Sequence, residues 1–212
     1  MEWFVYPLLA FVLGSIPFGR IIGRAAARVD VREVGSRNIG ATNVAREVGL
    51  RWGVATLVLD ALKGAAPVLV LGAVTGAPGL AELCGLAAVG GHQFSPFLGF
   101  QGGKGVATAL GVFLAMEPLA CAAALAVFLI VVALSDIISL GSMSAACCIP
   151  LFLALWGGSG ARIAVAAAVA ALILFAHREN MGRILRGEER RWRGHPEGQP
   201  RRSRRRSSSS SE

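Results

Sequence analysis

The chain has few charged residues. Only 16% of its 212 residues are charged, compared with about 25% in ordinary soluble domains, whereas 54% are hydrophobic and the mean hydropathy is +0.60. This balance excludes an ordinary soluble globular domain and indicates an integral membrane protein. Aromatic residues make up only 7% of the chain, but there are 27 glycines. Because small residues let helices approach closely in a bilayer, we expect helix interfaces built from them.

Cysteine and histidine are also scarce. Cys84, Cys121, Cys147 and Cys148 all lie in apolar stretches without a Cys-x-x-Cys spacing, and the chain has only three histidines. We therefore expect neither a metal site nor a cofactor, and we interpret the cysteines as small buried side chains. No basic residues precede the first apolar run, so we expect it to remain as a membrane span rather than to be cleaved as a signal peptide.

The formal net charge of +8 arises mainly from two clusters of arginine. Seven arginines lie within residues 20–51 and eleven within residues 178–206, which leaves only three basic residues elsewhere. Basic clusters beside apolar spans follow the positive-inside rule and place both segments in the cytoplasm. No nucleic-acid-binding motif accompanies them, so nucleic acid is not an expected partner.

The apolar runs predict an all-α, polytopic bundle of membrane helices. A span needs about 20 residues, and the expected spans are residues 3–22, 53–74, 79–89, 106–134, 137–156 and 161–176. Both arginine clusters face the same side only if residues 106–134, divided at Glu117 and Pro118, cross twice. The prediction is therefore seven transmembrane helices, with the N-terminus outside and the C-terminus cytoplasmic. The alternative is five spans with two short re-entrant segments.

The chain divides into two parts by composition. Residues 1–187 form the predicted integral membrane domain. Residues 188–212 are rich in arginine and serine, and such a polar, charged composition is typical of a disordered cytoplasmic tail.

Three polar, glycine-rich strings interrupt the apolar chain, at residues 35–46, 91–108 and 177–180. In the seven-span topology all three meet the cytoplasmic face. Ser142, near the start of the sixth expected span, meets the same face and is a further candidate for substrate binding. Several polar strings at one face indicate a shared site.

The second string contains a candidate phosphate site. Gly102, Gly103, Lys104 and Gly105 precede an expected helix, so unpaired backbone N–H groups and the positive end of the helix dipole would lie beside an ammonium group. The string is not a Walker A loop, because the position six before Lys104 is Leu98 and no Ser or Thr follows the lysine. The competing interpretation is a flexible hinge with a lysine that reaches the interface.

The first string offers hydroxyl and amide groups together with guanidinium groups, which suit phosphate oxygens. Taken alone, it could also be a polar loop that caps helices. The candidates in this string are Ser36, Asn38, Thr42, Asn43 and Arg46.

The third string has His177 and Asn180 one turn apart, so both can point in the same direction. His177 could be a general base, an orienting group or a phosphate ligand, and a merely solvated histidine is the alternative. Glu179 is expected to pair with an arginine and to have a structural role.

Two charged residues and one histidine are expected inside the bundle. Asp60 and Lys63 lie one turn apart in the second expected span, where isolated charges are costly, so we expect them to pair and to be structural. His92 is expected to shape the approach to the glycine loop and to bind substrate.

Five motifs in one order, at residues 14–19, 35–46, 60–64, 91–108 and 177–180, resemble those of the bacterial acyl-phosphate:glycerol-3-phosphate acyltransferases, the PlsY family. The resemblance extends over residues 3–187. The sequence departs from the family pattern at Asp136, where an arginine is usual, and at Gln101, where a basic residue is common.

The resemblance implies a multi-pass enzyme of the bacterial inner membrane that acts as a monomer without a cofactor. It would transfer a fatty acyl group from acyl phosphate to the sn-1 hydroxyl of glycerol 3-phosphate, releasing phosphate and forming lysophosphatidic acid. Within this family pattern Ser36, Arg46, His177 and Asn180 support activity, and Glu179 supports the structure. In the same pattern, glycerol 3-phosphate is bound by Gly102, Gly103, Lys104 and Gly105.

A cationic pocket at the lipid interface suits this reaction, because both substrates carry phosphate. Catalysis could depend mainly on proximity and on charge neutralisation by Arg46 and Lys104, and the hydroxyl proton could go to His177 or to a substrate phosphate oxygen. A transporter of organic phosphates is the alternative function. It is disfavoured because little polarity is expected at mid-bilayer, and a non-catalytic scaffold does not explain three phosphate-suited strings.

Overall fold

The computed structural model describes residues 1–77 and 79–194, and within these residues the regular structure is entirely helical. The helices are α1 (Glu2–Gly14), α2 (Phe18–Ala27), α3 (Ala41–Glu47), α4 (Leu50–Thr75), α5 (Leu80–Gln93), the 3-10 helix η1 (Pro96–Leu98), α6 (Val106–Met116), α7 (Pro118–Ser135), α8 (Ile138–Leu155), α9 (Gly160–Ala176) and α10 (Arg178–Leu185). The predicted all-α class is confirmed for the described part of the chain.

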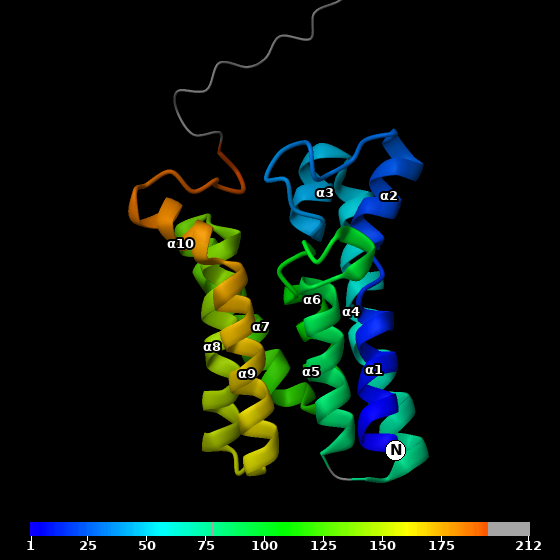
Figure 1. Cartoon of the computed structure of the whole chain (residues 1–212). Helices are drawn as coiled ribbons and strands as arrows, with labels where there is room; N and C mark the ends of the chain where they lie inside the picture. Colours follow the sequence, from blue (N-terminus) through cyan, green and yellow to red (C-terminus); the bar gives the residue numbers. More distant parts are fainter. Residues whose placement is uncertain (78, 195–212) are drawn as a thin grey trace, which may run out of the picture.

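The long helices stand side by side as a bundle, with α2, α3 and α10 gathered at one end (Figure 1). Among the described residues, four segments are long and apolar enough to cross a membrane: α1 with α2, α4, α7 and α8. The pair α9 and α10, bent by 59°, makes a fifth if it is one span. The shorter α5 and α6, of 14 and 11 residues, lie within the same bundle. The protein is therefore an integral membrane helix bundle.

Proline positions explain where the apolar runs break. The first run divides into α1 and α2 at Pro17, which has no N–H to continue the helical ladder. The run at residues 106–134 divides between Met116 and Pro118, so α6 and α7 are separate helices, as the sequence predicts. Pro118 takes the first position of α7, where the missing N–H leaves no hydrogen bond unmade.

Small residues form a close helix contact, which confirms the expectation from composition. A Cβ at Gly111 on α6 would overlap the carbonyl of Ala61 on α4, and a Cβ at Gly64 on α4 would overlap the carbonyl of Thr108. The backbones of α4 and α6 are thus closer than any larger side chain would allow, as is common where lipid removes the hydrophobic driving force between helices.

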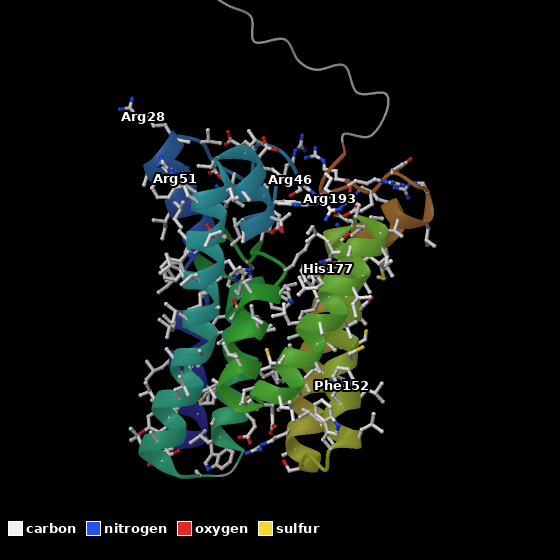
Figure 2. The ribbon with its side chains drawn as sticks, turned by 180° about the vertical axis from the view of Figure 1, so that it is seen from behind. Arg28, Arg46, Arg51, Phe152, His177 and Arg193 are labelled. Atoms are coloured by element: carbon white, nitrogen blue, oxygen red, sulfur yellow. The ribbon has the colours of Figure 1, made fainter. Side chains whose placement is uncertain are left out.

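The two ends of the bundle differ in charge. Arg28, Arg46, Arg51 and Arg193 all lie at the end that also holds His177, whereas Phe152 lies toward the other end (Figure 2). This concentration of arginine at one end is the arrangement that the positive-inside rule describes.

The opposite end carries a smaller ion-pair cluster. Arg162 on α9 contacts Glu82 on α5 at 3.2 Å and Glu117, at the start of α7, at 2.6 Å. This cluster joins three helices far from the arginine-rich end.

Candidate functional site

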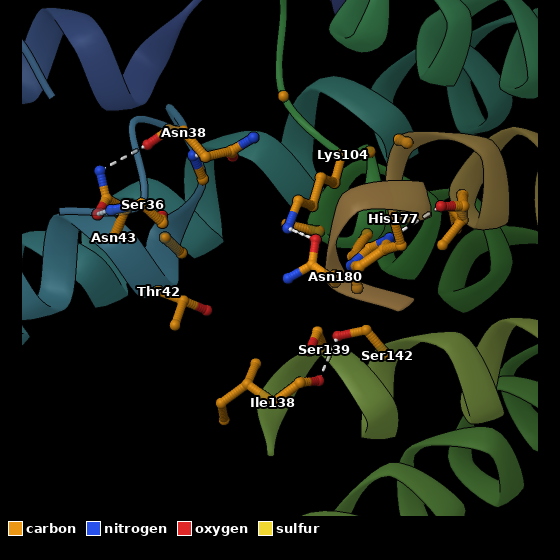
Figure 3. Close-up of a pocket in the computed structure, with 18 of the residues that line it drawn as sticks. Ser36, Asn38, Thr42, Asn43, Lys104, Ile138, Ser139, Ser142, His177 and Asn180 are labelled. Atoms are coloured by element: carbon orange, nitrogen blue, oxygen red, sulfur yellow. Dashed lines mark hydrogen bonds between the residues drawn. The ribbon is translucent and has the colours of Figure 1, made fainter. Parts of the chain in front are cut away.

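A cavity of about 1130 Å³ opens at the arginine-rich end and extends down into the bundle. It is lined by residues from all three polar strings, together with the first turns of α8. Ser36, Thr42, Lys104, His177 and Asn180 therefore share one cavity, with the first string on one side and the α9–α10 junction on the other (Figure 3). The predicted convergence of the strings is present in the structure.

Asn43 holds the first string in shape. Its buried amide donates to the carbonyls of Val31 and Asn38 at 2.8 and 2.9 Å, and its Oδ1 accepts from the N–H of Ser36 at 2.8 Å. Asn38 in turn accepts from the N–H of Gly40 at 2.9 Å. The amide of Asn43 and the Oδ1 of Asn38 are therefore occupied within the loop. The predicted contact of both residues with substrate stays a prediction.

Asp30 fixes the preceding turn. Its carboxylate contacts Arg20, Arg24 and Arg32 at 3.1, 3.1 and 2.9 Å, and the hydrogen bond from Arg32 is the main reason that its pKa lies far below the usual value. Sequence reasoning missed this cluster, although an aspartate among evenly spaced arginines was a visible signal.

The remaining polar groups of the first string face the cavity. The hydroxyls of Ser36 and Thr42 make no side-chain hydrogen bond to any described residue, and they are available to a ligand. Arg46 stacks on the ring of Trp192 at 5.4 Å and donates to the carbonyl of Arg191 at 3.3 Å. The guanidinium of Arg46 is thereby held at the rim of the cavity.

The glycine loop is folded against the end of α5. The N–H of Gly102 donates to the carbonyl of Gln93 at 2.9 Å and that of Gly103 to the carbonyl of His92 at 3.0 Å, while Gln93 Nε2 donates to the carbonyl of Lys104 at 3.0 Å. The expectation that these two N–H groups are unpaired is therefore wrong, because the last turn of α5 supplies acceptors for them. The N–H groups of the first turn of α6 keep no such partner among the described residues, and they still point toward the loop end of the cavity.

Lys104 crosses the cavity to the third string. Its ammonium donates to Oδ1 of Asn180 at 2.5 Å. Burial lowers the pKa of Lys104 to about 8, and the negative charge of Glu189 opposes that shift. Lys104 is therefore a cation near neutral pH that is only weakly hydrated, which suits an anionic ligand.

His177 ends α9, with its ring in the cavity. Its Nδ1 lies 2.8 Å from the carbonyl of Ile173. Because a carbonyl only accepts, Nδ1 carries the hydrogen, and in the neutral ring Nε2 is then an acceptor. An acceptor at this position suits a substrate hydroxyl.

The other predicted residues of this region have different surroundings. Ser142 donates to the carbonyl of Ile138 at 2.9 Å, within α8, and lines the cavity. Glu179 is exposed and lies 3.9 Å from Arg183 one turn later, so the expected pairing with an arginine is present. Glu189, which sequence reasoning assigned to a disordered tail, is buried against Asn180.

The expected charge pair lies inside the bundle. Lys63 contacts Asp60 at 2.7 Å, and both side chains are almost fully buried. Lys63 also donates to the carbonyl of Ile16 at 2.7 Å, at the break between α1 and α2. Nδ1 of His92 lies 3.8 Å from Asp60, and its ring lies directly beneath Gly103. The pair thus lies next to His92, which in turn packs against the glycine loop.

The deeper part of the cavity is apolar. Below the polar rim it is lined by α4, α6, α7 and α8 through residues such as Leu57, Leu110, Ala124, Phe128 and Ile149. A cavity with a cationic rim and an apolar interior can accommodate an amphiphile.

The fold and the site together define a helical membrane protein whose cationic, glycine-lined cavity suits phosphorylated amphiphiles. The family described as glycerol-3-phosphate acyltransferase matches residues 4–187. The chain therefore belongs to the glycerol-3-phosphate acyltransferase family, and the predicted membrane acyltransferase is confirmed. None of these comparisons supports the transporter alternative.

Relatives and solved structures agree with this assignment. The glycerol-3-phosphate acyltransferase of Desulfotalea psychrophila is 46% identical over 194 residues, covering 90% of this chain and 98% of the relative. That of Geobacter sulfurreducens is 46% identical over 185 residues, covering 87% and 95%. Two crystal structures of PlsY, an integral membrane glycerol 3-phosphate acyltransferase, superpose with TM-scores of 0.86 and 0.85 at 40% and 39% identity. Each covers 90% of this chain, with 96% and 95% of the other chain, and they represent the glycerol 3-phosphate and lysophosphatidic acid forms.

Proposed function

We propose that the protein transfers a fatty acyl group from acyl phosphate to the sn-1 hydroxyl of glycerol 3-phosphate, forming lysophosphatidic acid in phospholipid biosynthesis. The hydroxyl oxygen forms a bond to the acyl carbon, the bond from that carbon to the phosphate oxygen breaks, and inorganic phosphate leaves. The observation that supports this function best is one cavity with a cationic rim and an apolar interior. Such a cavity can hold two phosphate groups and one acyl chain together, which supplies proximity.

Each proposed role follows from a position in the cavity. Lys104 and the first turn of α6 bind the phosphate of glycerol 3-phosphate. Arg46 neutralises the phosphate of the acyl donor, and the hydroxyl of Ser36 donates a hydrogen bond to it. Nε2 of His177 accepts the hydrogen bond of the attacking hydroxyl. The proton then goes to His177 or to a phosphate oxygen of a substrate.

In this proposal the acyl chain lies in the apolar part of the cavity. Leu57, Leu110 and Phe128 line the cavity below the rim, and an acyl chain placed there leaves its carbonyl near the polar groups. An acyl chain in the bilayer is already in apolar surroundings, so the apolar interior mainly positions the chain and does not gain the full free energy of transfer from water.

We place the protein in the bacterial inner membrane with seven spans: α1 with α2, α4, α5, α6, α7, α8 and α9. The arginine-rich end faces the cytoplasm, the N-terminus lies outside, and the protein acts as a monomer. A thiol reagent that does not cross membranes tests the orientation in intact cells, with cysteine-free protein as the background. We expect it to label a Ser159→Cys variant, in the α8–α9 turn, and to spare an Arg28→Cys variant.

Purified protein in detergent tests the reaction directly. It is given glycerol 3-phosphate with either palmitoyl phosphate or palmitoyl-CoA, and both phosphate release and lysophosphatidic acid are measured. We expect product with palmitoyl phosphate and none with palmitoyl-CoA. Product from palmitoyl-CoA alone would contradict the proposed donor, and uptake of glycerol 3-phosphate into vesicles without product would favour a transporter.

A further inference from the structure

The segment after α10 places a carboxylate inside the site. Glu189 accepts hydrogen bonds from Ser139 Oγ at 2.6 Å and Asn180 Nδ2 at 2.5 Å, both at its Oε1, and from Arg183 Nε at 2.7 Å at its Oε2. Only 8% of its side chain is exposed, compared with 57% for the neighbouring Glu188. Three donors converge on one buried carboxylate that has no role in the reaction proposed above.

The carboxylate determines which way the amide of Asn180 points. The oxygen and nitrogen of an asparagine side chain are distinguished by their partners. A carboxylate only accepts and an ammonium group only donates, so Nδ2 must face Glu189 and Oδ1 must face Lys104. The reversed amide would set oxygen against oxygen and donor against donor. Glu189, Asn180 and Lys104 therefore form one ordered chain of hydrogen bonds.

The segment that carries Glu189 is fastened on both sides of the cavity. Asp136 accepts the N–H of Trp192 at its carbonyl, at 2.8 Å, and the N–H of Arg193 at its carboxylate, at 3.1 Å. The ring of Trp192 lies against Arg46 on α3. Residues 188–193 thus connect the start of α8 with the first polar string.

We propose that Glu189 is a positioning residue for acyl transfer: through Asn180 it holds the ammonium group of Lys104 where glycerol 3-phosphate binds. This inference rests on the proposed function and adds a residue outside the polar strings. Glu189 lines the cavity, but its oxygens accept from Ser139, Asn180 and Arg183, so in this proposal its effect reaches the reaction through the amide of Asn180.

The test compares Glu189→Gln with Glu188→Gln in the full chain. Glu188 is the matched control because it is adjacent and exposed, it also lines the cavity, and its ion pair within the described part of the chain is with Arg186, at 2.8 Å. We expect Glu189→Gln to raise the KM for glycerol 3-phosphate about tenfold, which corresponds to about 1.4 kcal/mol, while the KM for palmitoyl phosphate changes less than about twofold. Glu188→Gln should leave both values unchanged.

A pH profile separates this role from a general loss of structure. The ionisable groups that face Lys104 are Glu189, His177 at the end of α9, and Glu179 and Arg183 on α10. The charge of Glu189 favours the protonated lysine, so its loss lowers the pKa of Lys104 below about 8. The alkaline limb of kcat/KM should move to lower pH in Glu189→Gln and stay in place in Glu189→Asp. Glu189→Asp retains the negative charge. If Glu189→Gln does not fold, the pH profile of Glu189→Asp can still be compared with that of the unchanged protein.

Binding of glycerol 3-phosphate, measured by calorimetry, checks the route through Asn180. If Glu189 acts through that amide, Glu189→Gln weakens binding when Asn180 is present. In a chain that already carries Asn180→Ala, the same substitution causes no further loss of affinity. Additive losses would overturn the proposal, as would an unchanged KM in an active Glu189→Gln protein. A lower KM would also overturn it, because the carboxylate would then be a competitor for the phosphate position. If the unchanged chain transfers no acyl group from palmitoyl phosphate, the proposed function fails instead, whatever the variant does.

Discussion

The ring of His92 packs against Gly103, with Nε2 only 2.1 Å from the position that a Cβ on residue 103 would occupy. The N–H of Gly103 also donates to the carbonyl of His92 at 3.0 Å. The glycine loop therefore packs on the last turn of α5, and this contact fixes the position of Lys104 in the cavity.

We expect Gly103→Ala to lower acyl transfer at least about tenfold, because the added methyl group must push the loop or His92 aside, and such overpacking costs about 1–3 kcal/mol. Gly90→Ala is the matched control, since a Cβ at Gly90 on α5 meets no atom within 4 Å. Activity of the two variants in detergent checks the prediction. Equal activity of both would show that the loop tolerates displacement.

The pKa of Lys104 predicts a pH dependence. It is lowered to about 8, and a lysine is charged below its pKa. Affinity for glycerol 3-phosphate should therefore be full near pH 7 and decline as the pH rises through about 8. In Lys104→Arg the cation persists to pH values above about 12. We expect this variant to lose the alkaline decline in 1/KM, whatever its absolute affinity, and a decline that persists at pH 8 would assign the titration to another group.

The helices were predictable because the apolar runs are long enough to be membrane helices, and proline or glycine interrupts several of them. The break at Pro118 and the pairing of Asp60 with Lys63 follow from local rules, proline chemistry in one case and one-turn spacing in the other. The structure agrees with the sequence in both places.

The parts that sequence reasoning missed depend on contacts between distant residues. Ser139 and Glu189 are 50 residues apart, and nothing in the arginine-rich composition around Glu189 distinguishes a buried carboxylate from a solvated one. The carbonyls of α5 likewise satisfy Gly102 and Gly103 only because the loop folds back onto that helix. The helices α3 and α10 are too short for a clear periodic signal, and they are stabilised by packing against their neighbours.

The buried pair of Asp60 and Lys63 predicts a characteristic stability pattern. Removal of one partner leaves an uncompensated charge, which typically costs about 3–5 kcal/mol, whereas removal of both is often nearly neutral. We expect Asp60→Leu to lower the thermal unfolding midpoint in detergent strongly and the double variant with Lys63→Met to recover most of the loss. The recovery should be incomplete, because Lys63 also binds the carbonyl of Ile16.

A partly exposed cluster provides the contrast for that pair. The side chain of Arg162 is 45% exposed, and it contacts Glu82 and Glu117, which are 11% and 23% exposed. Because water reaches the guanidinium, we expect Arg162→Ala to lower the unfolding midpoint less than Asp60→Leu does. If Arg162→Ala lowers the unfolding midpoint as much as Asp60→Leu does, burial is not the reason that Asp60 and Lys63 contribute to stability.

His177 is the residue on which turnover should depend most directly. Its Nδ1 is committed to the carbonyl of Ile173, so Nε2 is the nitrogen that faces a substrate hydroxyl. We expect His177→Ala to lower kcat about 100-fold at saturating substrates, within the range for loss of a general base, with a smaller effect on the KM for glycerol 3-phosphate. His177→Gln keeps an acceptor near the position of Nε2 but cannot take the proton. Partial recovery of kcat in the glutamine variant would assign the proton to a substrate phosphate oxygen, and no recovery would assign it to His177. Undiminished turnover in His177→Ala would remove the histidine from the reaction.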